Sequence, residues 1–258
     1  MIKNLNILNY RGLQLSAILS TPDNGQKYPV IILLQGFLGK KDGEKLNSLS
    51  TYLLKLGFAT ARFDYPGYGQ SEGEISKEYL VSQIINDIGC IIDFLNTQPD
   101  LNMSKVGIWG QSMGGMLSII FASLHPDIRA VCAVSPPIQI TRGDDLEKIS
   151  AGWKDRGFIE RRNSINELIK IPYDFVKDAR KWNAKELITD IHVPVLVILG
   201  KKDDVVPPGI TRELFQAANE PKELMELDDM PHDYKEQVNF MDMINKISGE
   251  FFLKHLLI

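Results

Sequence analysis

Two hydrophobic patterns alternate along this chain, and this alternation restricts its fold more than any other feature. Short continuous apolar runs are typical of strands buried on both faces of a sheet, and they are separated by segments with apolar residues at helical spacing. The strand-like runs are residues 28–36, 58–67, 104–110, 128–137, 193–200 and 222–229, and the helical segments are residues 44–57, 77–98, 112–125, 211–219 and 236–257. Such an alternation predicts an α/β fold with a mostly parallel sheet and helices on both of its faces.

The first twenty residues follow a different pattern. Residues 5–8 and 13–19 alternate polar and apolar side chains on either side of Arg11 and Gly12, which predicts an antiparallel hairpin. The hairpin would extend one edge of the parallel sheet. We therefore expect residues 1–258 to form a single α/β domain.

Residues 138–190 interrupt the alternation and are too long for a loop without structure of its own. Periodic apolar patches predict several short helices here, forming an inserted cap over the carboxyl ends of the strands, where ligands bind in such sheets. The large aromatic residues of this segment are Trp153, Phe158, Tyr173, Phe175 and Trp182. Most are expected in the core of the cap, and Trp153, Phe158, Tyr173 and Trp182 are the candidates for lining a substrate pocket.

Composition excludes several classes of function. A net charge of −4, without a basic stretch interleaved with aromatic residues, does not fit nucleic-acid binding. No apolar run reaches the ~18 residues of a membrane span, and the N-terminus lacks the apolar core of a signal peptide, so a cytoplasmic protein is expected. Cys90 and Cys132 are expected as buried thiols. No metal-binding spacing and no phosphate-binding glycine loop occurs, so neither a metal nor a cofactor is expected. The sequence is compatible with a homodimer.

The segment 109–115, WGQSMGG, holds Ser112 between Gly110 and Gly114, directly after a predicted strand and at the start of a predicted helix. This is the setting of a nucleophile elbow, a sharp turn that exposes the serine side chain. The two glycines would remove side chains that collide with neighbouring backbone. The alternative interpretation is an ordinary turn in which a small residue caps a helix.

A serine hydroxyl is a poor nucleophile unless a base takes its proton, and histidine suits this role near neutral pH. His232 follows the last predicted strand, where strand ends converge, and is the candidate base. His125 lies at a helix end, His192 precedes a strand, and His255 lies in the last helix, so none of these is favoured.

A carboxylate must hold the imidazole in its reactive tautomer and stabilise the imidazolium ion. Asp203 and Asp204 come just after the strand 193–200, and either could face the histidine. Asp228, Asp229 and Asp233 are nearer to the histidine in sequence, but a surface role is expected for each.

The order Ser112, Asp203, His232 on alternating strands and helices resembles the α/β-hydrolase superfamily, from about Tyr28 to the C-terminus apart from the insertion. The superfamily's acid motif, three residues after a glycine, selects Asp203 over Asp204. The resemblance also implies an oxyanion hole made by the backbone N–H groups of Phe37 and Met113. The chain departs from the common pattern at residue 35, where glutamine replaces the usual histidine.

The N-terminal hairpin, the QGFLG loop and residues 175–207 are similar to bacterial cinnamoyl and feruloyl esterases with a cap. This resemblance implies a serine carboxylesterase acting on small or medium acyl esters, including aromatic acyl esters, with a small-molecule ester as its partner. The alternatives are a serine aminopeptidase, a monoacylglycerol lipase, an acyltransferase, or a non-catalytic receptor or scaffold of the same fold. A peptidase would bind a free amino terminus through acids such as Asp144, Asp145 and Glu147. The pair Arg161–Arg162 is either solvated or meets an anionic substrate.

Overall fold

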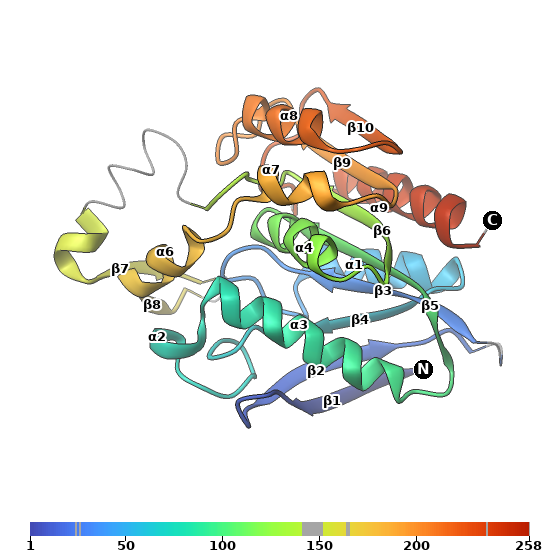
Figure 1. Ribbon diagram of the computed structural model, residues 1–258, viewed down its shortest axis with the longest axis horizontal. Helices are drawn as coiled ribbons and strands as arrows, with labels where there is room; N and C mark the ends of the chain where they lie inside the picture. The colour runs from blue at the N-terminus through green and yellow to red at the C-terminus, as the bar shows by residue number, and fades with distance from the viewer. Residues whose placement is uncertain (24, 26, 141–151, 164–165, 236, 258) are drawn as a thin grey trace.

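The central element of the molecule is an eight-stranded sheet with the strand order β1-β2-β4-β3-β5-β6-β9-β10 (Figure 1). The computed structural model describes residues 1–258 except 24, 26, 141–151, 164–165, 236 and 258. The strands are β1 (Ile2–Leu8), β2 (Gln14–Ser20), β3 (Tyr28–Leu34), β4 (Ala59–Phe63), β5 (Leu101–Gln111), β6 (Ile128–Val134), β9 (Val195–Gly200) and β10 (Lys222–Leu227). Strands β3 to β10 of this sheet pair in parallel, whereas β1 and β2 form an antiparallel hairpin and β2 pairs antiparallel with β4. The predicted sheet and hairpin are confirmed.

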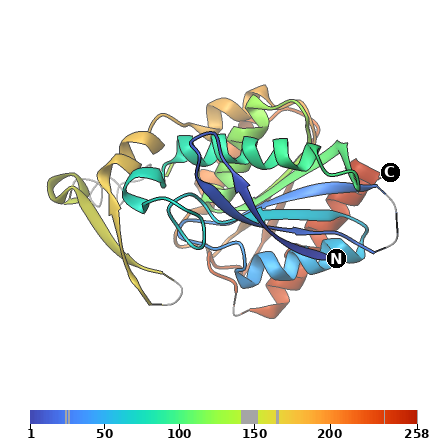
Figure 2. The ribbon, with the colours of Figure 1, turned by 90° about the horizontal axis from the view of Figure 1, so that it is seen from below.

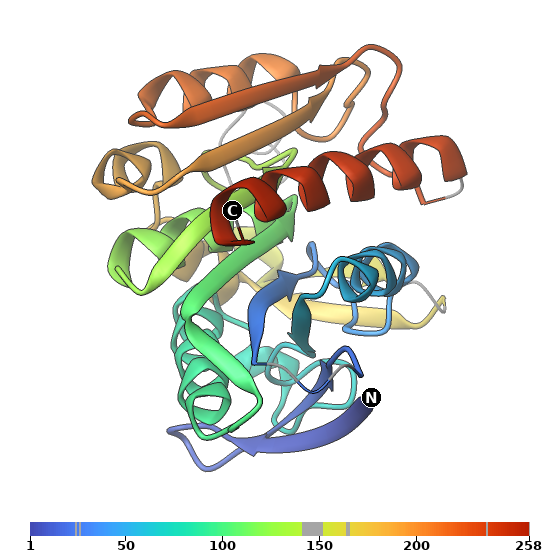
Figure 3. The ribbon, with the colours of Figure 1, turned by 90° about the vertical axis from the view of Figure 1, so that its right-hand side faces the viewer.

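Helices cover both faces of this sheet (Figures 2 and 3). One face carries α3 (Val81–Asn96), α4 (Met113–Leu124), α7 (Ala184–Leu187) and α8 (Pro208–Ala217), and the other carries α1 (Glu44–Lys55) and α9 (Val238–Phe252), which continues as a π-helix over Leu253–Leu257. Strand β3 is apolar throughout because helices pack on both of its faces. Its alternate side chains belong to two cores: Ile32 and Leu34 pack in one, and Ile31 and Leu33 pack in the other. No helix in the described part of the chain is both long and apolar enough to cross a membrane.

The predicted helix 77–98 is interrupted in the structure, where α2 (Ile75–Glu78) and α3 are separate helices. Tyr79 lies between them and is fully buried, and its hydroxyl accepts a hydrogen bond from the backbone N–H of Leu38 at 2.8 Å. Leu80 has an extended backbone (φ −121°, ψ 145°). The long-range contact of Tyr79 therefore replaces the helical turn that local spacing predicts.

The insertion over residues 138–190 contains the expected short helices, α6 (Tyr173–Ala179) and α7, and a 3₁₀ turn at Ile188–Asp190. It also contains a two-stranded sheet that was not predicted, formed by β7 (Phe158–Arg162) and β8 (Leu168–Pro172). This hairpin projects beyond the main sheet, at the left of Figures 1 and 2. Asp144, Asp145 and Glu147, considered above for a peptidase, lie outside the described residues.

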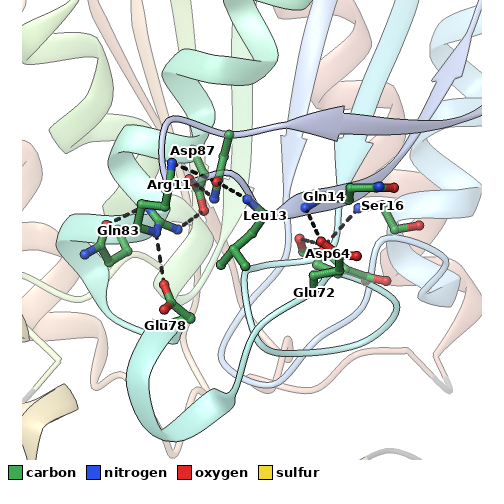
Figure 4. A network of polar contacts seen from close by, with 11 residues as sticks. Arg11, Leu13, Gln14, Ser16, Asp64, Glu72, Glu78, Gln83 and Asp87 are labelled. Atoms are coloured by element: carbon green, nitrogen blue, oxygen red, sulfur yellow. Dashed lines mark hydrogen bonds and ion pairs between the residues drawn. The ribbon is translucent and has the colours of Figure 1, made fainter.

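A partly buried charge network joins the turn of the N-terminal hairpin to α2 and α3 (Figure 4). The guanidinium of Arg11 donates to Glu78 and Asp87 at 2.9 Å each and to Gln83 at 2.5 Å, and the amide of Asn9 donates to Asp87 at 3.0 Å. Burial raises the pKa of the Asp87 carboxyl to about 6, against the hydrogen bonds from Arg11 and Asn9, which lower it. The folded protein therefore holds this proton more tightly than the unfolded chain does, and the stability that results is lost as pH rises through about 6.

Replacing Arg11 tests this network. Arg11→Met leaves Asp87 buried without its counter-charge, so the free energy of unfolding should fall by about 3 kcal/mol at about pH 8. At about pH 5 the loss should be smaller, because the carboxyl can be protonated there. Urea unfolding at both pH values measures the difference, with the exposed Arg129→Met as the matched control. Equal losses at the two pH values would contradict this account.

Candidate active site

Ser112 lies at the junction of β5 and α4 in a backbone conformation that L-amino acids rarely adopt, with φ 56° and ψ −122°. Its N–H donates to the carbonyl oxygen of Val134 on β6 at 2.8 Å, and its own carbonyl accepts from the N–H of Met116 at 3.0 Å. Strained residues of this kind persist only where the surrounding structure fixes them, and they concentrate at functional sites. The turn is the strand-to-helix elbow that the sequence predicts.

Only glycine fits at positions 110 and 114, on either side of Ser112. A Cβ atom at Gly110 would lie 2.0 Å from the carbonyl oxygen of Gly114, and a Cβ atom at Gly114 would lie 2.3 Å from the carbonyl oxygen of Leu34. No side chain fits at such distances from backbone atoms. The predicted reason for the two glycines is thus confirmed by the packing of the backbone.

The side chains of Ser112, His232 and Asp203 form a continuous chain of hydrogen bonds. Ser112 Oγ lies 3.0 Å from His232 Nε2, and His232 Nδ1 lies 2.8 Å from Asp203 Oδ2. Because an ionised carboxylate only accepts hydrogen bonds, Nδ1 carries the proton and Nε2 is left to accept from the serine hydroxyl. The three residues predicted from the sequence are therefore brought together in the geometry that proton transfer requires.

Asp203 is held in place from both sides. It lies just beyond β9, 6% exposed, and its second oxygen accepts the backbone N–H groups of Val206 at 2.7 Å and Val205 at 3.0 Å. Burial acts to raise the pKa of Asp203, but the hydrogen bond from His232, the electrostatic attraction of the same side chain and the hydrogen bond from Val206 outweigh it, so the pKa is lowered. The neighbouring Asp204 is exposed, which agrees with the choice of Asp203.

The remaining histidines lie elsewhere. His125 stacks on Phe121 at the end of α4, with ring centroids 3.9 Å apart. The ring of His192 lies 3.5 Å from the amide of Asn219, and His255 lies 3.5 Å from a carboxylate oxygen of Glu223. None of the three contacts Ser112.

The other carboxylates close to His232 in the sequence, those of Asp228, Asp229 and Asp233, form ion pairs in different places. Asp228 and Asp229 pair with Lys201 and Lys202 at the surface, as expected, at 2.6 and 2.7 Å. Asp233 is also largely exposed, but it pairs with Lys45 of α1 at 3.0 Å on the wall of the cleft beside Ser112. Sequence reasoning missed this ion pair, because nothing in the sequence relates α1 to the loop of His232.

The loop after β3 passes directly beside Ser112. A Cβ atom at Gly36 would lie 3.4 Å from the Cβ of Ser112, and Leu38 has a φ of 55°. The ring of Phe37 packs against the rings of Phe175 and Tyr79, at centroid distances of 5.2 and 5.9 Å. Met113 is the first residue of α4, so its N–H lies at the positive end of that helix. The assignment of the Phe37 and Met113 N–H groups to an oxyanion hole stays a prediction.

Gln35, which stands where the superfamily usually has histidine, supports this loop. Its side-chain amide donates to the carbonyl oxygen of Phe63 at 2.8 Å, and its backbone carbonyl accepts from the hydroxyl of Tyr65 at 2.7 Å. Both bonds join the end of β3 to the end of β4. The departure at this position therefore preserves a structural role.

A buried ion pair fixes the far end of the same loop. Asp64 accepts the side-chain ammonium and the backbone N–H of Lys41, both at 2.8 Å, and the N–H of Gln70 at 2.9 Å. The hydroxyl of Ser71 donates to the carbonyl oxygen of Asp64 at 2.6 Å and accepts the N–H of Ser16 on β2 at 2.9 Å; Asp64 and Ser16 are labelled at the right of Figure 4. This connection ties the loop to β2, next to the edge strand of the sheet.

A cleft of about 950 Å³ opens above Ser112 and His232. The loop after β3 and the start of α1 form one wall, and Arg161, Arg162 and Asn163 of the insertion form part of the lining.

None of the four aromatic residues predicted to line a substrate pocket lines this cleft, and each has another contact. The indole N–H of Trp153 donates to the carbonyl oxygen of Ile171, and that of Trp182 to the hydroxyl of Ser82 on α3. Phe158 lies under the ammonium of Lys170, and the hydroxyl of Tyr173 accepts from Arg180. These residues build the insertion and attach it to the domain, which corrects the prediction.

Residues 26–167, more than half of the chain, match the family model Hydrolase_4, described as serine aminopeptidase, S33. The chain belongs to this family. The α/β-hydrolase fold predicted from the sequence is confirmed, as is the resemblance to that superfamily.

Several known proteins are similar to this chain. An uncharacterized 31.7 kDa protein of Escherichia coli is 28% identical over 273 residues, covering 91% of this chain and 94% of that protein. The mitochondrial palmitoyl-protein thioesterase ABHD10 of Homo sapiens is 28% identical over 187 residues, covering 70% of this chain and 59% of that protein. The structure of Est1E from Butyrivibrio proteoclasticus with ferulic acid bound has a TM-score of 0.82 at 20% identity, covering 97% and 99% of the two chains. Together with the family match, these neighbours support hydrolase activity.

The contacts around two glycines predict that replacing each of them by alanine changes the free energy of unfolding by different amounts. Gly110→Ala places a methyl group 2.0 Å from a backbone oxygen, so it should destabilise the protein by at least about 3 kcal/mol. Gly209→Ala, in α8, meets no atom within 4 Å and should be neutral or stabilise by about 0.5 kcal/mol. Urea unfolding compares the two variants, and similar losses in both would contradict the steric argument.

The lowered pKa of Asp203 predicts a pH dependence of stability. An aspartate with a lowered pKa stabilises the folded state above its unfolded pKa of about 3.9, and this contribution is lost as pH falls through the folded value. Asp203→Asn should therefore lower the free energy of unfolding at about pH 7 and flatten its decline between about pH 5 and pH 3. The exposed Asp204→Asn is the matched control. An unchanged acid slope in Asp203→Asn would contradict the prediction.

Proposed function

We propose that this protein is a serine carboxylesterase that hydrolyses small or medium acyl esters through an acyl-enzyme on Ser112. The observation that carries the proposal is the hydrogen-bonded chain from Ser112 Oγ through His232 to Asp203, at 3.0 and 2.8 Å, on the floor of a cleft of about 950 Å³. A nucleophile, a base and a group that orients the base are the parts that acyl transfer requires. A receptor or scaffold of the same fold would have no need for this alignment.

In the proposed reaction, Ser112 Oγ attacks the carbonyl carbon of the ester while His232 Nε2 takes the hydroxyl proton. The backbone N–H groups of Phe37 and Met113 stabilise the oxyanion that develops. The imidazolium then gives its proton to the departing alcohol, and the acyl group stays on Ser112. A water molecule, activated by His232, releases the acid and restores the serine. Asp203 stays ionised throughout and stabilises the imidazolium.

The insertion is proposed to act as a cap. Arg161, Arg162 and Asn163 lie on the wall of the cleft that also contains Ser112, so this part of the insertion contributes to the space in which a substrate would bind. Charged side chains prominent in this lining fit a small polar ester better than the long apolar chain of a monoacylglycerol lipase substrate. Two neighbours, a palmitoyl-protein thioesterase and Est1E with ferulic acid bound, support an acyl ester or thioester as the substrate.

A serine aminopeptidase is the second candidate, because it is the description of the matching family. The same hydrogen-bonded chain would serve amide hydrolysis, which needs more assistance to the leaving group than ester hydrolysis. The relative rates on esters and aminoacyl amides distinguish the two functions.

A fluorophosphonate probe and a panel of p-nitrophenyl esters, feruloyl esters and aminoacyl p-nitroanilides test the proposal. We expect labelling and ester turnover in the unmodified protein, and a loss of at least about 10⁴-fold in turnover in Ser112→Ala. Ser123→Ala is the matched control, since its hydroxyl lies on the same helix and donates to the carbonyl oxygen of Ile120.

Two outcomes would contradict the proposal. Equal labelling of Ser112→Ala and the unmodified protein would remove Ser112 from the mechanism. Faster turnover of aminoacyl amides than of esters would favour the peptidase.

A further inference from the structure

We propose that the substrate carries an anionic group, a carboxylate or a phosphate, that is bound by Arg161 and Arg162. This inference rests on the proposed function and adds the substrate class. Both arginines stand at the end of β7 and line the same cleft as Ser112 and His232. A substrate with its ester carbonyl at Ser112 would therefore present another part of the molecule to this end of β7.

Both guanidinium groups have N–H donors that can bind a ligand. Arg161 donates to the carbonyl oxygen of Glu160 at 3.2 Å, and Arg162 donates to that of Asn166 at 2.8 Å. Among the described residues, neither arginine is joined to a carboxylate by an ion pair, and the carboxylate of Glu160 on the same strand pairs with Lys170 instead, at 3.8 Å. Since each guanidinium has five N–H groups in a planar fork, both can still bind a carboxylate or a phosphate with two parallel hydrogen bonds.

The charge of the cleft also favours an anion. Five cationic side chains line it, Lys40, Lys45, Arg161, Arg162 and Lys235, against three acidic ones, Asp42, Glu44 and Asp233. Asp233 is shared by Lys45 at 3.0 Å and Lys235 at 3.4 Å. The lining is thus positive although the chain as a whole carries a net charge of −4. A concave surface with an excess of positive charge concentrates anionic ligands.

Hydrogen bonds between Asn163 and Glu167 lie next to the two arginines. Asn163 donates from its backbone N–H to the carbonyl oxygen of Glu167 at 3.0 Å and from its side-chain amide to the Glu167 carboxylate at 2.8 Å. The backbone N–H of Glu167 donates back to the side-chain oxygen of Asn163 at 2.9 Å. Because these hydrogen bonds come directly after Arg162, they restrain the backbone at the end of β7 that carries the two arginines.

Matched pairs of substrates test the proposal and locate the anion. Mono-p-nitrophenyl adipate and p-nitrophenyl hexanoate have acyl chains of equal length, and only the adipate carries a carboxylate on the acyl side. Acetyl coenzyme A and S-acetyl-N-acetylcysteamine release similar thiols, and only the coenzyme carries phosphates on the leaving-group side. We expect kcat/KM to be higher for the anionic member of one of the pairs, and the preference to shrink as salt is raised.

The variants separate this proposal from a general effect on activity. The double variant Arg161→Gln/Arg162→Gln should lower kcat/KM for the preferred anionic substrate about tenfold and change that for its neutral partner by less than about twofold. Lys170→Gln, which removes a cation from the same hairpin outside the cleft, is the matched control and should change neither value by more than about twofold.

The anion proposal and the esterase proposal would be contradicted by different results. Equal turnover of the anionic and neutral members in both pairs, or equal losses on both in the double variant, would overturn the anion proposal and leave the esterase standing. Absence of turnover of all four substrates by the unmodified protein, together with absence of labelling by fluorophosphonate, would overturn the proposed function and this inference with it.

Discussion

The close approach of three backbone segments beneath Ser112 is the constraint on which the candidate site depends. The end of β5, the first turn of α4 and the end of β3 come so near to one another that only glycine fits at Gly110 and Gly114. The same contact holds Ser112 at a positive φ and brings the loop after β3 beside its side chain. A substitution that disrupts this junction would therefore affect both Ser112 and the predicted oxyanion donors, Phe37 and Met113.

A second close backbone contact brings Asp203 and His232 together. A Cβ atom at Gly200, the last residue of β9, would lie 2.1 Å from the carbonyl oxygen of Met230, which precedes His232 by two residues. The N–H of Lys202 also donates to this oxygen, at 3.3 Å. Since β9 and β10 are parallel neighbours, their carboxyl ends lie side by side. Asp203 and His232 thus meet because the loops that carry them share backbone contacts.

Local pattern was sufficient for the sheet, for most of the flanking helices and for the turn at Ser112, because each depends on hydrophobic spacing or on a few neighbouring residues. It left Asp203 and Asp204 open, and the resemblance to the superfamily selected Asp203. Local pattern failed where a distant contact decides the outcome. The helix predicted over 77–98 is broken at Tyr79 because its hydroxyl binds the backbone of Leu38. The cap aromatics were expected at the pocket, but Trp153 and Trp182 use their indole N–H groups to bind partners inside the protein.

The β7–β8 hairpin forms a sheet of its own, separate from the eight-stranded sheet that carries Ser112, Asp203 and His232. Changes in the length or charge of such a hairpin leave the strand register of the main sheet untouched. Evolutionary changes within β7 and β8 can therefore alter the wall of the cleft at Arg161 and Arg162 while the arrangement of Ser112, His232 and Asp203 is kept.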